Sequence, residues 1–416
     1  MNESRPQESY LDIVWRQFRK NRYALVSLWL LVPLIAIAIF APALASDRPF
    51  VFFGEYETHY PWFRQLFDPP ETVDYLFNMA AVAFLPCLAA GLLLNRRWKA
   101  AELPGRERLG RALGLYVAAT ALLAVVYSID AFEIKDSDNF ATLYPQLEYE
   151  SNGAQYGIYP LVPLGPRELK LVARFKAPGH VTPREEWQDA NDGFPHVLGT
   201  DNGGRDVLVQ LIYGTRISMT VGFVAVGIYL TIGVLVGALA GYFGGRVDML
   251  ISRVIEVILL FPAFFLIITL VGLVGPSIFL IMVVIGLTGW PTVARLIRGE
   301  VLKERKIDYV AAAKSLGAGH RRILFRHILP NAISPALVAA PFGVAGAIIT
   351  ESGLSLLGFG VRPPTPSWGA FLYLASRNYN YWWLIVVPAV AIFVTVTIFN
   401  LVGAGLRDAM DPRMRI

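Results

Sequence analysis

The side chains that could do chemistry in this chain are sparse and do not form a recognised catalytic set. The sequence has no GxxxxGKS/T phosphate loop, no HExxH helix and no GxSxG elbow. Its single cysteine, Cys87, lies in an apolar run and excludes a disulfide or a cysteine-based metal site. The five histidines are scattered over polar segments, and arginines near His320 and His327 disfavour a bound cation there. We therefore expect no catalytic residue, no metal site and no cofactor bound by this chain.

Ionisable residues within apolar runs would mark an ion or proton pathway. Here they lie near the ends of such runs: Asp130, Arg253, Glu256, Arg295 and Glu351. No run carries a central acidic or histidine relay, which disfavours an ion-coupled carrier and a selective ion pore. Glu351 and Ser352, in IITESGLSLLGFG, are the candidates for lining a pathway. The alternative is that Glu351 lies at the outer membrane–water boundary.

Two polar triplets precede a long apolar run and could act together. They are Gly199, Thr200 and Asp201, then Gly204, Arg205 and Asp206. The aspartates can cap a helix that begins near Asp206, and Arg205 can pair with a neighbouring carboxylate. The functional alternative is an outer gate or a contact with a binding protein, and one structure could serve as both cap and gate. Farther along, Gly244-Gly245 and Asp248 predict a tight turn with a structural role.

The basic segment Asp308–Asn331, DYVAAAKSLGAGHRRILFRHILPN, separates two strongly apolar runs. It predicts a helix from Asp308 to Leu316, a break at Gly317-Ala-Gly319, and a second basic helix that Pro330 ends. The alternative is a solvated basic loop, which the ordered Ala, Gly and Pro spacing disfavours. Such a segment in an apolar chain indicates that a partner outside the membrane binds it.

Composition assigns these segments to an all-α integral membrane protein. The 416 residues are 55% hydrophobic and 17% charged, with a mean hydropathy of +0.48. The net charge of +5 does not indicate nucleic acid, because the basic residues are concentrated in particular loops. Runs of about 20 apolar residues predict eight spans. These are Tyr23–Ala45, Asp74–Leu94, Leu109–Ile129, Ile217–Tyr242, Val254–Val274, Ser277–Ile297, Ala332–Thr350 and Trp383–Leu406.

Loop charges predict the orientation of these spans. Lysine and arginine are concentrated in the tail 1–22, in the loop after the second span and in the basic segment, whereas the alternate loops are acidic or neutral. Because basic loops stay in the cytoplasm, both termini and Asp308–Asn331 are expected to be cytoplasmic. The expected division is a basic tail 1–22, a first span 23–45, an outer loop with two extra spans 46–130, an extracytoplasmic segment 131–205 and a tail 408–416. In structure, the extracytoplasmic segment could be an ordered lobe or an irregular cap. In function, it could be a solvated loop or a docking surface for a partner.

The basic segment resembles the cytoplasmic coupling loop of ABC-transporter permease subunits, whose signature is EAA, three residues, Gly, nine residues, then I-x-LP. Ala311, Ala312 and Ala313 stand at the EAA positions, Gly317 has the required spacing, and Leu329-Pro330 close the motif. Ala311 replaces the Glu of the signature and His327 replaces its Ile. The flanking DYV and RHILPN resemble the peptide-transporter branch.

Further segments resemble the same branch: Leu198–Ser218, Gly241–Val257, Ser355–Gly369 and Gly405–Pro412. The C-type subunit of oligopeptide, dipeptide and nickel systems is the most similar type. The start SDRPFVF after the first span and the long outer segment resemble microcin-C-type peptide importer permeases. The resemblance implies a type I importer permease core of five to six spans over 206–407, with a coupling loop at 298–331. The two spans near Asp74–Ile129 are additional to that pattern.

The resemblance also implies the partners. A second permease, two ATPases that bind ATP and Mg²⁺, and a periplasmic binding protein would complete the importer in a bacterial inner membrane. The helix Asp308–Leu316 would enter a groove of an ATPase, with small residues allowing close approach and Tyr309 and Leu316 providing an apolar grip. Arg321, Leu329 and Pro330 belong to the same coupling loop. The alternatives are a stand-alone channel or secondary carrier, a membrane-embedded enzyme, or a permease for a nickel chelate or an opine.

Overall fold

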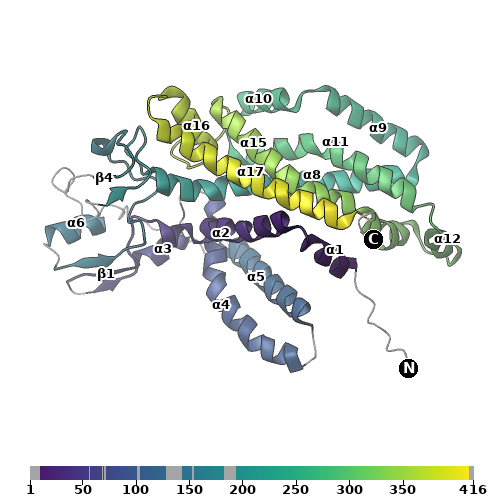
Figure 1. The fold of residues 1–416 in the computed structure, drawn as a ribbon, viewed down its shortest axis with the longest axis horizontal. Coiled ribbons are helices and arrows are strands. Elements are labelled where there is room, and N and C mark those ends of the chain that lie inside the picture. The colour runs from purple at the N-terminus through teal and green to yellow at the C-terminus, as the bar shows by residue number, and fades with distance from the viewer. Residues whose placement is uncertain are drawn as a thin grey trace. The chain divides into compact units, whose positions relative to one another are not determined.

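A computed structural model describes residues 10–55, 57–67, 69, 72–100, 104–127, 143–151, 154–181 and 194–411 (Figure 1). The chain divides into two compact units, neither of them continuous in sequence. Unit 1 comprises Met1–Val32, Ser218–Arg362 and Ala389–Ile416, and unit 2 comprises Pro33–Ile217 and Pro363–Pro388. Helices α2 (Arg22–Leu44), α8 (Val207–Phe243) and α17 (Trp382–Met410) each run from one unit into the other. The consecutive division into tails, spans and loops stays a prediction.

Seven helices within the described residues are long and apolar enough to cross a membrane, or eight if one bent pair counts as a span. They are α2, α4 (Thr72–Ala100), α5 (Gly105–Tyr127), α8, α11 (Ile278–Glu304), α15 (Ser334–Leu356) and α17. Each coincides with a span expected from hydropathy, which confirms the all-α membrane class.

The remaining expected span, Val254–Val274, is not one straight helix. It is divided between α9 (Gly245–Leu260) and α10 (Ala263–Val274), which are bent by 76° at the break. Pro262 has no backbone N–H and forces Phe261 into an extended conformation, with φ −86° and ψ 124°. The apolar run continues through this proline, so hydropathy alone could not detect the break.

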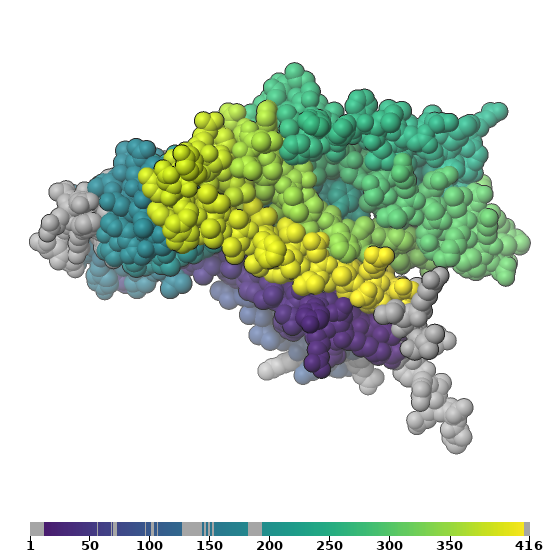
Figure 2. Space-filling view, turned by 45° about the horizontal axis from the view of Figure 1, so that its top comes forward, coloured from purple at the N-terminus to yellow at the C-terminus, as the bar shows by residue number. Residues whose placement is uncertain are grey.

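Within unit 1, the C-terminal half of α8 packs closely against α11. Gly233, Gly237 and Gly241 recur every fourth residue and face the α11 backbone, so that a Cβ on Gly241 would lie 2.8 Å from the Arg298 carbonyl oxygen. Small residues at this spacing let two membrane helices approach closely. At one end of the unit, α1 (Tyr10–Phe18) lies against the C-terminal end of α17, with Phe18 and Ala409 in one buried cluster (Figures 1 and 2).

Unit 2 contains the segment 131–205, whose described ranges are ordered and pair with strands from the loop after α2. Strands β1 (Val51–Phe53), β2 (Thr58–His59) and β3 (Tyr156–Ile158) form an antiparallel sheet in the order β2-β1-β3, and β4 (His180–Val181) pairs with β5 (Pro195–His196). The short helices are α3 (Pro61–Phe67), α6 (Leu143–Glu150), the 3-10 turn η2 (Leu171–Ala173) and α16 (Trp368–Arg377). The described parts thus match an ordered lobe, whereas Asp130 lies outside the described residues.

A buried apolar cluster anchors this lobe to the membrane helices of unit 2. Ala41 and Ala45 of the first span pack with Val162 and Leu164 of the lobe and with Tyr213 of α8. The Tyr213 hydroxyl donates to the Ala45 carbonyl at 2.9 Å. The lobe is therefore fixed to the beginning of α8.

Candidate coupling loop and outer polar network

The helix predicted from Asp308 to Leu316 is present as α12 (Asp308–Ser315), and its end is closed by two backbone hydrogen bonds. The Gly317 N–H donates to the Lys314 carbonyl at 2.9 Å, and the Ala318 N–H donates to the Ala313 carbonyl at 3.1 Å. This Schellman pattern requires a left-handed residue after the helix, and Gly317 has φ +79°. The glycine at the required spacing therefore makes the sharp turn that the sequence predicted.

A buried contact and a polar network hold α12 on the rest of the loop. Val310 is fully buried, and the Tyr309 hydroxyl donates to Glu304 Oε2 at 2.6 Å. Asn331 Nδ2 donates to the Tyr309 oxygen at 3.2 Å and to the His327 carbonyl at 3.1 Å. Burial, followed by the hydrogen bond to Glu304, raises the pKa of Tyr309, so its hydroxyl remains a donor at neutral pH.

This network gives Tyr309 a structural role beside the expected apolar grip, which stays a prediction. Its hydroxyl is bonded inside the loop and its side chain is half-buried, so it fixes α12 on the loop. Leu316 is 88% exposed and remains available for such a grip. Ala311 and Ala312 are also exposed, whereas Ala313 is half-buried.

The loop beyond Gly319 forms an open, basic hollow of about 640 Å³. Its lining includes Arg321, Arg322, Arg326, Pro330 and the half-exposed ring of Phe325. Beneath it, Ile323, Leu324 and Ile328 are buried. The loop thus presents small residues on one part and positive charge around an aromatic ring on the other.

Pro330 does not end the second helix, contrary to the expectation from sequence. The helical path runs through α13 (His320–Arg322), a π-turn (η3, Ile323–Ile328) and α14 (Leu329–Ala332) to Ser334, where α15 begins. Pro330 stands in the first turn of α14, where a missing backbone N–H is tolerated, and the π-turn directly before it widens the helix. Leu329 is half-buried in this path.

A neighbouring turn supports the same end of unit 1. Gly244 and Gly245 have φ +67° and +52° between α8 and α9, which confirms the predicted tight turn. Arg298 Nη2 donates to Asp248 Oδ2 at 2.7 Å, and Arg298 Nε also bonds this carboxylate. Arg305 Nη1 donates to the Tyr242 carbonyl at 3.0 Å at the end of α8. Side chains of α11 and its extension therefore cap α8 and hold α9.

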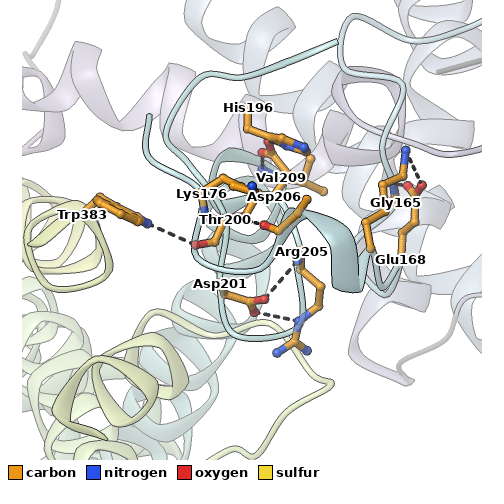
Figure 3. A network of polar contacts seen from close by, with 12 residues as sticks. Gly165, Glu168, Lys176, His196, Thr200, Asp201, Arg205, Asp206, Val209 and Trp383 are labelled. Carbon is orange, nitrogen blue, oxygen red and sulfur yellow. Dashed lines mark hydrogen bonds and ion pairs between the residues drawn. The ribbon is translucent and has the colours of Figure 1, made fainter. Parts of the chain in front are cut away.

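The two outer triplets form one buried network in unit 2 (Figure 3). Asp201 Oδ1 accepts the backbone N–H groups of Gly203 at 2.7 Å and Arg205 at 3.0 Å, and Asp201 Oδ2 accepts Arg205 Nε at 2.8 Å. Asp206 Oδ1 accepts the Val209 N–H at 3.0 Å and so caps α8. The predicted cap and the predicted arginine–carboxylate pair are both confirmed.

Partners that the sequence analysis did not identify complete this network. His196 Nδ1 lies 2.9 Å from Asp206 Oδ2, and Trp383 Nε1 donates to the Thr200 carbonyl at 3.1 Å. The Lys176 N–H donates to Thr200 Oγ1 at 2.8 Å. All six residues of the triplets, Gly199, Thr200, Asp201, Gly204, Arg205 and Asp206, are buried. Their side chains are therefore not a contact surface, and they act by joining the lobe to α8.

Glu351 and Ser352 are both buried in α15. Their expected role along a pathway stays a prediction. Ser355 Oγ donates to Glu351 Oε1 at 2.8 Å and accepts the Val361 N–H at 3.2 Å. The hydrogen-bonded side chains of Glu351 and Ser355 therefore connect α15 to the residues that follow it.

Arg216 is a central buried charge that sequence reasoning missed. It is fully buried in α8, and its Nη1 donates to Asp74 Oδ1 at 3.0 Å and to Asn78 Oδ1 at 2.9 Å, both on α4. Its Nε donates to the Ala38 carbonyl at 2.6 Å. Pro42 lacks the N–H that would bond this carbonyl within α2, and Arg216 replaces it. An arginine at the start of an apolar run was the available signal.

Comparison with known proteins shows the family of this chain. Residues 233–416 match the family described as binding-protein-dependent transport system inner membrane component, and residues 9–70 match the N-terminal transmembrane domain of oligopeptide transport permease C. A dipeptide transport system permease of Bacillus subtilis is 39% identical over 59% of this chain and 78% of its own length. One from Alkalihalophilus pseudofirmus is 40% identical over 53% of this chain and 73% of its own.

An oligopeptide transport system permease of Haemophilus influenzae is 42% identical over 53% of this chain and 71% of its own length. Among solved structures, the crystal structure of an amino acid ABC transporter with histidines is 21% identical, with a TM-score of 0.36 over 47% of this chain and 91% of that one. The two family matches leave residues 71–232 uncovered, a stretch that includes α4 and α5.

Proposed function

Because this chain belongs to the inner membrane permease family of binding-protein-dependent ABC peptide transporters, as its C-type subunit, we propose that it forms part of the pathway of an ATP-driven importer of peptides or peptide-like solutes. It would pair with a second permease and take its energy from two ATPase subunits. Substrate would arrive on a periplasmic binding protein. A solute of the microcin C type stays a prediction from the resemblance.

The coupling loop is the observation that carries the proposal. The exposed residues of α12 include the small Ala311, Ala312 and Ser315, and the helix is followed by Leu316, which is 88% exposed. Such an exposed apolar side chain beside a basic hollow favours a protein partner. The buried Val310 and the Tyr309 network fix α12 on the permease, so that force applied to α12 reaches α11 and α14.

The orientation is part of the proposal. We place both termini and α12 in the cytoplasm, because basic residues gather in those segments. The packing of α1 against the end of α17 supports a common side for the two termini, since Asn21 Nδ2 also donates to Asp408 Oδ2 at 3.3 Å.

For the binding protein we propose a contact that avoids the buried triplets. The lobe exposes apolar side chains near them: Leu161 is 77% exposed, Leu171 64% and Val197 50%. Exposed apolar residues on an ordered lobe suit a transient protein contact better than buried polar ones. The triplets would keep the lobe rigid while the binding protein is docked on it.

The test is a charge placed on the α12 face. Ala312→Glu would bury an unpaired charge in the ATPase groove and should lower peptide uptake and binding-protein-stimulated ATPase activity at least about tenfold. Lys306→Glu, at an exposed position just before α12, introduces the same side chain outside the groove and should change both rates by less than about twofold.

Copurification of the second permease shows whether each variant is folded. Normal uptake by an assembled Ala312→Glu complex would contradict coupling through α12. Uptake that continues without ATP would favour a stand-alone channel or carrier instead.

A further inference from the structure

The hairpin of α4 and α5 contains a long groove that the transport mechanism does not use. Only 22% of the most apolar window of α4 and 6% of that of α5 are buried, so the helices expose most of their apolar surface. The groove between them has a volume of about 640 Å³. It lies in the part of the chain that neither family match covers.

Most of the residues that line the groove are apolar. Phe84, Leu88, Leu92 and Leu113 contribute to its walls, and the helices approach closely where Gly91 meets Ala112. At the inner end, the Tyr116 hydroxyl donates to the Ala80 carbonyl at 2.9 Å and joins the two helices. This shape suits one extended hydrocarbon chain.

The other end of the groove is cationic. Arg108 Nη1 donates to Asn95 Oδ1 at 3.1 Å, but Arg108 Nε is buried and has no hydrogen-bond partner among the described residues. A buried guanidinium donor favours an anionic oxygen acceptor. Lys99 and Arg111, which follow and precede the lining residues Trp98 and Ala112 in sequence, are exposed and add positive charge near this end.

We propose that the groove binds an anionic phospholipid, with one acyl chain along the apolar walls and the headgroup phosphate at Arg108. The charge at the mouth favours an anionic over a zwitterionic headgroup, and anionic lipids are abundant in cytoplasmic leaflets. The apolar walls distinguish a lipid from free phosphate, which would have no use for them. The inference requires that the hairpin crosses the membrane but does not depend on what is transported.

Native mass spectrometry of the purified full-length permease, in the complex in which it is isolated, tests this inference. Detergent-solubilised complex is incubated with dioleoylphosphatidylglycerol or dioleoylphosphatidylcholine, and the lipid retained per permease is measured. Phosphatidylglycerol should be retained about tenfold more than phosphatidylcholine. Arg108→Gln should remove most of this preference, whereas Arg97→Gln, on the same hairpin but outside the groove, should preserve it.

Leu92→Trp fills the groove without changing any charge and should also reduce retention. It keeps the test decisive if Arg108→Gln does not fold. Equal retention of the two lipids, or equal effects of Arg108→Gln and Arg97→Gln, would overturn the site in favour of diffuse attraction. Displacement of phosphatidylglycerol by millimolar inorganic phosphate would identify a phosphate site instead.

Discussion

Gly204 occupies a backbone position that other residues cannot take without moving the outer lobe. It has φ +75°, and a Cβ there would overlap the Lys170 carbonyl. The adjacent Gly203 lacks a positive φ, and its Cβ would meet the flexible end of Leu169. The network around Asp201 therefore depends on one glycine of this pair more than on the other.

Substitution by alanine should separate the two. Gly204→Ala should destabilise the solubilised protein by at least about 2 kcal/mol, because left-handed strain and a backbone overlap add together. Gly203→Ala should cost less than about 1 kcal/mol, because a side chain can move away. Thermal unfolding in detergent measures both, and similar Tm values for the two variants would contradict the argument.

For single residues, the sequence predicted backbone turns and helix caps better than it predicted hydrogen-bond partners. Gly317, Gly244 and Asp206 could be placed because positive φ angles and helix caps are local properties of a few residues. Tyr309 could not, because its partners Glu304 and Asn331 become neighbours only when α12 folds back on the loop.

At the scale of helices, Arg216 fastens α4, one of the two additional spans, to α2 and α8. Spans themselves are predictable, because a membrane requires about 20 apolar residues in a row. The pairing of Arg216 with Asp74 is not, because 142 positions separate them and no local pattern links them. The break at Pro262 has a local cause, the proline itself. It was not predicted because the apolar run continues on both sides of that proline.

Breaking this buried pair should be costly. Arg216→Met removes the buried guanidinium that bonds Asp74, Asn78 and the Ala38 carbonyl and should destabilise the protein by about 3–5 kcal/mol. The control is Arg253→Met, which breaks an exposed pair with Glu256 and should cost at most about 1 kcal/mol. Thermal unfolding and protease sensitivity of the α4–α5 hairpin report the difference. Equal losses in the two variants would show that Arg216 does not fasten the hairpin.

For the whole molecule, the decisive question is which side of the membrane each loop faces. Hydropathy and loop charge predict an alternating topology, with α12 inside and the lobe outside. Leu316 and Leu161 are suitable probes, because they are 88% and 77% exposed.

Single cysteines test this topology in a Cys87→Ala background. Leu161→Cys should react with a membrane-impermeant maleimide in intact spheroplasts, whereas Leu316→Cys should react only after permeabilisation. Labelling of both on intact spheroplasts, or the reverse pattern, would contradict the orientation. Labelling of both after permeabilisation is the control for accessibility.

The π-turn at Ile323–Ile328 has a geometric consequence for the C-terminal helices. One residue added to a helix rotates everything beyond it by about 100° around the axis, because a turn contains 3.6 residues. That single residue therefore sets how α15 is rotated about its axis relative to the basic hollow. It thereby also sets the direction in which the buried Glu351 side chain points. The rotation of a membrane helix about its own axis is in this way determined by a segment outside its apolar run.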